Sequence, residues 1–227
     1  MKKIIEKLKT RGIVFANGLT NKEFGDIEKL YKIKFPKQLK DFLSEAMPFS
    51  IHSNVPKIAS FSNEKVPYYY EFPFPIWNDF TEENIVKIKK WIDTPKNSVL
   101  EEYNEGKNFK DKATLEQNGK KTEIEIPGNY SLLEAATIDR TGKTEQTIDK
   151  EFKNFVENKL EKTIPIYSHR YILQKENSPI LSIAQSDDIV VYGENLIDYF
   201  EREFLEKKNS SEWGKIDFGC WDEIIMR

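Results

Sequence analysis

The sequence predicts an α+β fold in which helices pack on a mainly antiparallel sheet. Three short apolar runs follow one another closely, at Ile164–Leu173, Pro179–Gln185 and Ile189–Tyr192. Each run ends at turn-forming or charged residues, which is typical of a meander of strands. After them, apolar residues at helical spacing from Leu196 to Phe204 predict a helix that covers the sheet. We therefore expect three consecutive strands and one covering helix to form the centre of the fold.

The connections inside this stretch are short and polar. Lys175–Ser178 has the length and chemistry of a hairpin loop, and Ser186–Asp188 those of a tight turn. Asp187 and Asp188 also fit a pair of general acids or one end of a metal site. Two acids in a tight turn more often form an Asx bond to the backbone, so the turn is the favoured interpretation.

Composition indicates a globular protein. Aromatic residues make up 13% of the 227 residues, which argues against disorder. The net charge of -3 gives no overall attraction to nucleic acid or to an anionic membrane. Cys220 is the only cysteine, so no disulfide can form within the chain, and no apolar run approaches the roughly 20 residues that span a bilayer. These features predict a cytoplasmic protein with one domain over residues 1–227.

The N-terminal part is predicted to be mostly helical. A short helix in the first ten residues precedes a strand at Ile13–Phe15. Thr20 and Glu23 have the spacing of a capping box, which predicts the start of a helix. A second helix is expected to start at Pro36 and to end before Pro48, because proline is tolerated in a first helical turn.

The middle of the chain is more polar. Strands are expected between Pro56 and Phe72, and a helix capped by Thr81 is expected to end at Asp93–Pro95. Residues 97–147 are interpreted as a polar excursion from the main sheet, with a hairpin around Gln117–Lys121. The same region holds a short helix at 132–136.

The last part of the chain begins with a helix. Apolar residues between Ile148 and Leu160 have helical spacing and predict a helix that leads into the meander. Residues 206–227 form an extension that we expect to pack on the body, because it holds Trp213 and Trp221.

Several blocks together resemble the SUKH superfamily, in particular a bacterial subgroup of it. The residues that carry the resemblance are Leu19-Thr20, Glu23, Ile27-Glu28, Tyr31, Phe35-Pro36, Leu39, Phe42-Leu43, Phe74–Phe80, Ile164–Ile172, Ser178–Ile183, Asp187–Ile189 and Tyr192–Leu196. The resemblance covers Leu19–Trp91 and Leu160–Phe204. It departs at Asn97–Thr147, where the subgroup usually carries a helical segment with a tryptophan.

The resemblance implies a fold and a role. The fold is an α+β domain with helices on a mainly antiparallel sheet. Many bacterial members of the superfamily are immunity proteins that bind and neutralise polymorphic toxins, and some relatives are regulatory adaptors. Fold alone does not decide between these roles.

The residues themselves contain no assembled catalytic site. His169 and Arg170, read as neighbours on one strand, point to opposite faces and cannot act as a pair. Ser168 and His169 are excluded as a dyad for the same reason. We interpret His169 and Arg170 as a buried polar pair, with contact to a partner as the alternative. Metal-ligand spacings and glycine-rich phosphate loops are both missing from the sequence, so no metal and no cofactor are expected.

The resemblance, together with the missing catalytic site, implies a non-catalytic protein that binds a cognate toxin 1:1 and binds neither nucleic acid nor membrane. The alternative is an intracellular adaptor or regulator that binds a host protein. Aromatic residues are candidates for the dry centre of the interface and acidic residues for electrostatic steering. Together with His169 and Arg170, the candidate contact residues are Tyr68, Tyr69, Tyr70, Trp77, Glu101, Glu102 and Glu105.

Overall fold

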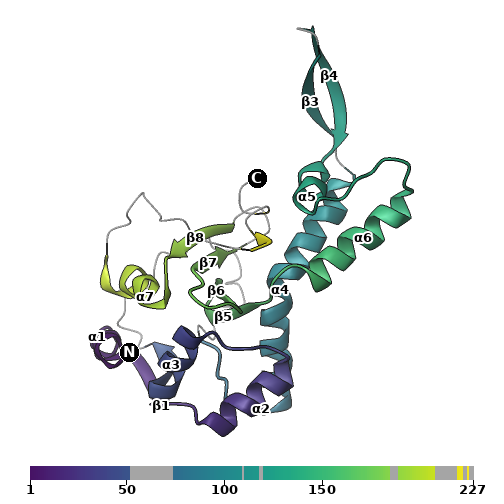
Figure 1. Cartoon of the computed structure of the whole chain (residues 1–227). Coiled ribbons are helices and arrows are strands. Elements are labelled where there is room, and N and C mark those ends of the chain that lie inside the picture. The colour runs from purple at the N-terminus through teal and green to yellow at the C-terminus, as the bar shows by residue number, and fades with distance from the viewer. Residues whose placement is uncertain are drawn as a thin grey trace, which may run out of the picture. The chain divides into compact units, whose positions relative to one another are not determined.

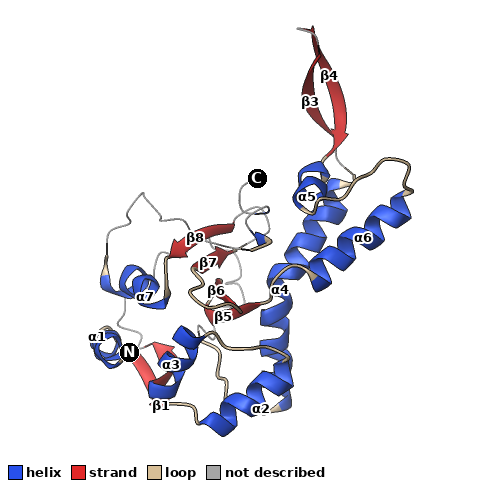
Figure 2. Ribbon diagram, viewed as in Figure 1, coloured by secondary structure: helices blue, strands red, loops and turns tan. Residues whose placement is uncertain are grey.

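The computed structural model describes residues 1–51, 74–108, 110–117, 120–184, 189–207, 219–221 and 224. These residues form an α+β protein (Figures 1 and 2). Its helices are α1 Lys2–Thr10, α2 Asn21–Tyr31, α3 Lys37–Glu45, α4 Glu82–Gly106, α5 Tyr130–Ala135, α6 Glu145–Asn158 and α7 Leu196–Leu205. Its strands are β1 Ile13–Asn17, β2 Ala46–Ile51, β3 Lys110–Gln117, β4 Lys120–Pro127, β5 Thr163–Tyr167, β6 Arg170–Leu173, β7 Ile180–Ile183 and β8 Ile189–Gly193. Within the described residues, no helix is long and apolar enough to cross a membrane.

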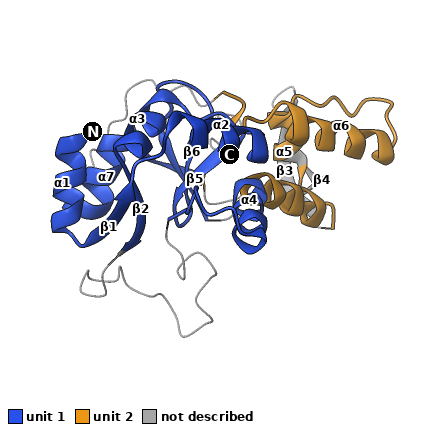
Figure 3. Cartoon of the chain, turned by 90° about the horizontal axis from the view of Figure 1, so that it is seen from below, with its two compact units in different colours: residues 1–93, 162–184, 190–218 blue, residues 94–161, 185–189, 219–227 orange. Residues whose placement is uncertain are grey.

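The chain divides into two compact units (Figure 3). Unit 1 comprises Met1–Asp93, Lys162–Ala184 and Val190–Phe218. Unit 2 comprises Thr94–Glu161, Gln185–Ile189 and Gly219–Arg227. A single domain over residues 1–227 stays a prediction.

The predicted meander is present in unit 1, with four strands where three were expected. Strands β5, β6, β7 and β8 form one sheet in chain order, and β6 is antiparallel to both β5 and β7. Its register places Ile172 opposite Ile164 on one side and opposite Ile180 on the other. All three isoleucines are fully buried. The hairpin loop predicted at Lys175–Ser178 connects β6 to β7, as expected.

The N-terminal helices follow the predicted pattern. The Thr20 hydroxyl accepts a hydrogen bond from the Glu23 backbone N–H at 3.2 Å, and the Glu23 carboxylate accepts one from the Thr20 N–H at 2.7 Å. This capping box fixes the first turn of α2. The apolar side of α2 then buries Phe24, Ile27 and Tyr31 in the core of unit 1.

The second predicted helix ends earlier than expected. α3 stops at Glu45, and Ala46 and Pro48 lie in β2, which is antiparallel to β1. Pro48 is opposite Phe15, next to a register shift between Val14 and Phe15. Proline is tolerated in strands at such irregularities, because no ladder hydrogen bond is needed from it there.

Helix α4 shows that the predicted break at Asp93–Pro95 is wrong. The helix continues through Pro95 to Gly106. Buried apolar residues recur along it three or four positions apart, at Ile88, Ile92, Pro95, Val99 and Tyr103, and Trp91 beside Ile92 is buried too. An interior proline costs about 3 kcal/mol. Burial of an apolar stripe on both sides of Pro95 offsets that cost, because each fully buried side chain contributes about 1.5–3 kcal/mol.

Unit 2 contains the hairpin, the short helix and the long helix that the sequence predicts between 110 and 160. β3 and β4 are antiparallel, with Gln117 opposite Lys120. The rings of Tyr103 in α4 and Phe152 in α6 stack with centroids 4.0 Å apart. The Tyr103 hydroxyl donates a hydrogen bond of 2.8 Å to Asp149. Helices α4 and α6 therefore share an apolar contact.

Little of the C-terminal extension is described. Trp221 and Ile224 are buried, and packing of the whole extension 206–227 on the body stays a prediction. The Trp221 indole N–H donates a hydrogen bond of 2.9 Å to the Glu161 carbonyl. Trp213, the strands predicted between Pro56 and Phe72, and the Ser186–Asp188 turn lie outside the described residues.

Candidate functional site

The turn that carries His169 differs from its prediction. Ser168 and His169 connect β5 to β6, and Tyr167 is opposite Arg170, so Ile164–Leu173 is a tight hairpin and not one strand. Ser168 has a φ of 48°, which is unfavourable for a residue with a Cβ. The Trp91 indole N–H donates a hydrogen bond of 2.9 Å to the Ser168 carbonyl. The Ile183 N–H donates one of 2.9 Å to the His169 carbonyl. Contacts distant in sequence therefore stabilise the turn.

The turn brings together two side chains that a strand would separate. Ser168 Oγ lies 3.1 Å from His169 Nδ1, so the expectation that the two point to opposite faces is wrong. This pair still lacks the properties of a catalytic dyad. Ser168 is buried, and burial together with the Arg170 charge lowers the pKa of His169 to about 4. An imidazole with so low a pKa is a weak base, and a substrate cannot reach the hydroxyl.

The lowered pKa of His169 predicts a pH dependence of stability. The unfolded chain takes up the proton at the ordinary pKa of 6.5, whereas the folded chain takes it up only near 4. The stabilisation is complete above pH 6.5 and is lost as the pH falls toward 4. Acidification through this range is expected to destabilise the wild type more than His169→Gln, by about 1–2 kcal/mol after solvent screening. Urea unfolding at several pH values measures the difference, and equal losses in the two proteins would contradict it.

Arg170 is the centre of a buried polar network in unit 1. Its Nη1 donates a hydrogen bond of 2.8 Å to Ser182 Oγ on β7. Its guanidinium lies 3.8 Å from the centre of the Tyr192 ring on β8. Its Nε is 3.4 Å from Glu203 Oε2 on α7. This distance is short enough for an ion pair but too long for a good hydrogen bond. This supports the interpretation of Arg170 as a buried polar residue with partners inside the fold, although its Nε makes no hydrogen bond with the described residues.

Glu203 is the buried partner that the sequence analysis missed. Only 3% of its side chain is exposed, and burial raises the pKa of its carboxyl while the Arg170 charge lowers it. The Tyr199 hydroxyl nearby is also buried, and burial and the Glu203 charge raise its pKa. One signal in the sequence could have indicated its burial. Glu203 lies three residues after Phe200 and four after Tyr199, which places it on the apolar stripe of the predicted helix.

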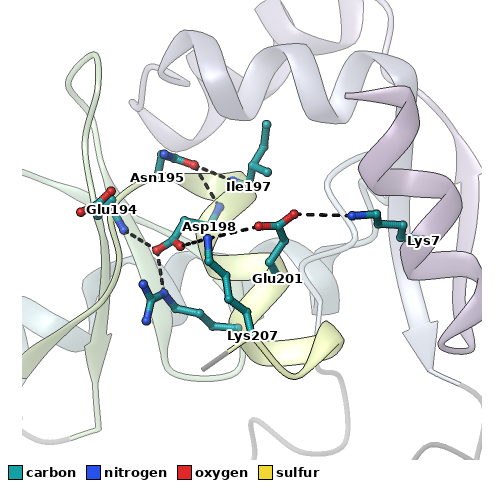
Figure 4. Close-up of polar contacts among 8 residues, drawn as sticks. Lys7, Glu194, Asn195, Ile197, Asp198, Glu201 and Lys207 are labelled. Carbon is teal, nitrogen blue, oxygen red and sulfur yellow. Dashed lines mark hydrogen bonds and ion pairs between the residues drawn. The ribbon is translucent and has the colours of Figure 1, made fainter. Parts of the chain in front are cut away.

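A second charged network surrounds the other side of α7 (Figure 4). Asp198 is buried and accepts hydrogen bonds of 2.7 Å from Arg202 and of 2.7 Å from Lys207. It also accepts one of 3.0 Å from the Glu194 N–H. These bonds lower the pKa of its carboxyl, against the effect of burial.

The same network reaches the N-terminal helix. Glu201 forms ion pairs with Lys207 at 3.2 Å and with Lys7 of α1 at 3.6 Å, which Figure 4 also shows. The charges on this side of α7 therefore neutralise one another and connect α7 to α1.

A polar hollow of about 320 Å³ lies where α3, the β6–β7 loop and the start of α7 meet. Gln38 bridges two of its walls, because its Nε2 donates to the Ser178 carbonyl at 2.7 Å and its Oε1 accepts from the Leu196 N–H at 2.9 Å. The Glu176 carboxylate accepts from the Lys37 N–H at 3.0 Å. The backbone N–H groups of Lys37 and Leu196, at the two helix starts, are thus already paired.

The remaining predicted residues are in different surroundings. Trp77 is 2% exposed, with its ring 5.9 Å from that of Tyr31 and 5.0 Å from that of Phe35. It belongs to the core of unit 1, so its indole cannot form the centre of an interface. The run Tyr68, Tyr69 and Tyr70 lies outside the described residues.

The three predicted acids lie on α4 within unit 2. Glu101 and Glu105 are exposed and Glu102 is half-buried. They belong to unit 2, whereas Trp77, His169 and Arg170 belong to unit 1.

The described residues offer surfaces and buried charge pairs, and no metal site. In this part of the chain, no three His, Cys, Asp or Glu residues are grouped so that they could hold a metal ion. Comparison of the sequence and the structure with protein-family models, curated proteins and solved structures finds no match.

Proposed function

We propose that this chain is a cytoplasmic immunity protein of SUKH type, which binds and neutralises a cognate bacterial polymorphic toxin without catalysing a reaction. One observation carries the proposal. The two blocks of resemblance, Leu19–Trp91 and Leu160–Phe204, lie almost wholly within the parts of the chain that form unit 1. The divergent stretch Asn97–Thr147 lies wholly in unit 2. A resemblance whose limits follow a structural boundary is more specific than one scattered over a chain.

The chemistry of unit 1 supports a binding role. The charged side chains around α7 are paired with one another, and Ser168 and His169 lack the exposure and basicity of a nucleophile and its base. A site for acyl or phosphoryl transfer needs an accessible nucleophile or a positioned cation.

Charge distribution supports a basic partner for unit 2. Between Thr94 and Glu161 the sequence holds 14 acidic and 11 basic residues, an excess equal to the net charge of -3 of the whole chain. Glu101 and Glu105 are exposed members of this set. A toxin that acts on nucleic acid presents a basic surface, and acidic groups opposite such a surface accelerate association.

Co-expression with the toxin encoded beside this protein tests the function. Cells that carry both genes are expected to survive, and cells that carry the toxin alone are expected to die. Cells that die equally with and without this protein would contradict the immunity function and favour an adaptor that binds a host protein.

The paired substitution Glu101→Lys with Glu105→Lys tests the acidic surface. It is expected to slow association with the toxin by roughly ten-fold at low salt and to have less effect at high salt. Stopped-flow binding measures the rate. The matched control is Lys150→Glu with Lys153→Glu, which changes exposed charges of the opposite sign on α6. An unchanged association rate after Glu101→Lys with Glu105→Lys would exclude these two acids from electrostatic steering.

A further inference from the structure

The β3–β4 hairpin forms a sheet of its own. Each strand has eight residues, and the register is continuous from Lys110 opposite Pro127 to Gln117 opposite Lys120. Figure 2 shows the pair as a separate ribbon. Among the residues that the structure describes, no third strand pairs with either of them. Both outer edges of the ribbon therefore have backbone donors and acceptors that no described strand pairs with.

Such a ribbon is unusual for a protein that folds by itself. An isolated two-stranded hairpin is at best marginally stable in water, and a long free edge is a template for pairing with another strand. Addition of a strand from another chain is a common way to complete such a sheet. The question is then which strand fits which edge.

The sequence of β3 is complementary to itself. Its centre is Lys112-Ala113-Thr114-Leu115-Glu116. A two-fold axis at Thr114 places two β3 strands antiparallel, with Lys112 opposite Glu116 of the partner subunit. Ala113 is then opposite Leu115 of the partner subunit, and the two threonines are opposite each other. Opposite charges and threonine pairs on facing strands are stabilising.

The edge formed by β4 fits a second copy less well. A two-fold axis at Glu123 or at Ile124 places glutamates opposite each other, and like charges directly opposite destabilise a strand pair. An axis at Thr122 places Lys121 opposite Glu123 of the partner subunit but pairs only the five residues Lys120–Ile124, whereas the axis at Thr114 pairs the seven residues Asp111–Gln117 of β3. Pro127 at the end of β4 also has no N–H to donate. The edge of β3 is therefore the better suited to a second copy.

We propose that this protein forms a symmetric homodimer in which β3 pairs with β3 of a second copy. The result is a four-stranded sheet in the order β4, β3, β3, β4, with the same surface contributed by both chains. The dimer does not depend on the proposed toxin.

Charge exchange within the hairpin tests the pairing without disturbing the hairpin itself. In one chain, Lys112 is opposite Glu125 and Glu116 is opposite Lys121. The variant K112E/E125K keeps opposite charges in the hairpin but places like charges opposite each other in the dimer. The variant E116K/K121E does the same with the other pair. In a mixed dimer with one copy of each variant, every pair of facing charged residues again has opposite signs.

Analytical ultracentrifugation of the full chain gives the result. The wild type is expected to sediment as a dimer of 26.7 kDa subunits. The dimer of each variant alone is expected to be weaker than the wild-type dimer by about ten-fold or more in dissociation constant. A mixture of the two variants is expected to regain the wild-type affinity. A wild type that stays monomeric at every concentration, or variants that each remain dimeric, would overturn the proposal.

A third variant tests the proposal in case the two charge-exchange variants fold poorly. Thr114→Lys places a lysine opposite Glu123 within the hairpin and two lysines opposite each other in the dimer. It is expected to be folded by circular dichroism and monomeric, and a folded T114K that is dimeric would also overturn the proposal.

Discussion

Truncation of Phe42 or Phe200 to alanine is expected to destabilise the protein by about 3–5 kcal/mol in each case. Both rings are 1% exposed, and their centroids are 4.7 Å apart in the core of unit 1. Phe42 comes from α3 and Phe200 from α7, so their contact connects two helices that are more than 150 residues apart in the sequence. Either truncation leaves a cavity that these helices cannot close without moving. Denaturant unfolding followed by circular dichroism measures the loss.

Two controls separate the cavity from a general effect of losing a ring. Phe80 is 46% exposed, and Phe80→Ala is expected to change stability by no more than about 0.5 kcal/mol. Phe42→Leu keeps most of the volume and is expected to cost less than about 1.5 kcal/mol. A loss below about 1 kcal/mol for both alanine variants would remove these rings from the core.

Removal of Arg170 alone is expected to be as damaging as a large cavity. Arg170→Met leaves the Glu203 carboxylate in a site where 3% of the side chain is exposed, without its opposite charge. Breaking one partner of a buried ion pair costs about 3–5 kcal/mol. The double variant Arg170→Met with Glu203→Gln removes the stranded charge and is expected to recover a large part of the loss. Full additivity of the two single losses would contradict the pairing.

The pH dependence of the Arg170→Met variant gives an independent readout. Burial already raises the pKa of Glu203, and loss of the arginine raises it further. The folded variant therefore binds a proton more tightly than the unfolded chain. Its stability should increase as the pH falls through the raised pKa of Glu203, so the cost of the substitution is largest at neutral pH and shrinks in acid. A cost that is constant with pH would indicate that the carboxyl is not buried in the variant.

Several elements could be predicted from the sequence because local rules decide them. The capping box at Thr20 and Glu23, the apolar side of α2 and the apolar stripe of α7 depend on residues within a few positions of one another. The β3–β4 hairpin also follows from local sequence, since Asn118-Gly119 favours a two-residue connection. The α+β class follows from these elements.

The candidate site depended on contacts that local rules do not contain. Ser168 adopts a positive φ because the Trp91 indole and the Ile183 N–H, both distant in sequence or on another strand, bind the carbonyls of the turn. Helix α4 passes Pro95 because burial on both sides of it outweighs one missing hydrogen bond. Trp77 and Arg170 look equally suited to a surface or a core until the rings and the carboxylate around them are known. The periodicity of the sequence by itself determined the helices and most of the strands, whereas the tertiary structure alone decided where charges are buried and which turn is strained, because those outcomes depend on side chains that only the folded chain brings together.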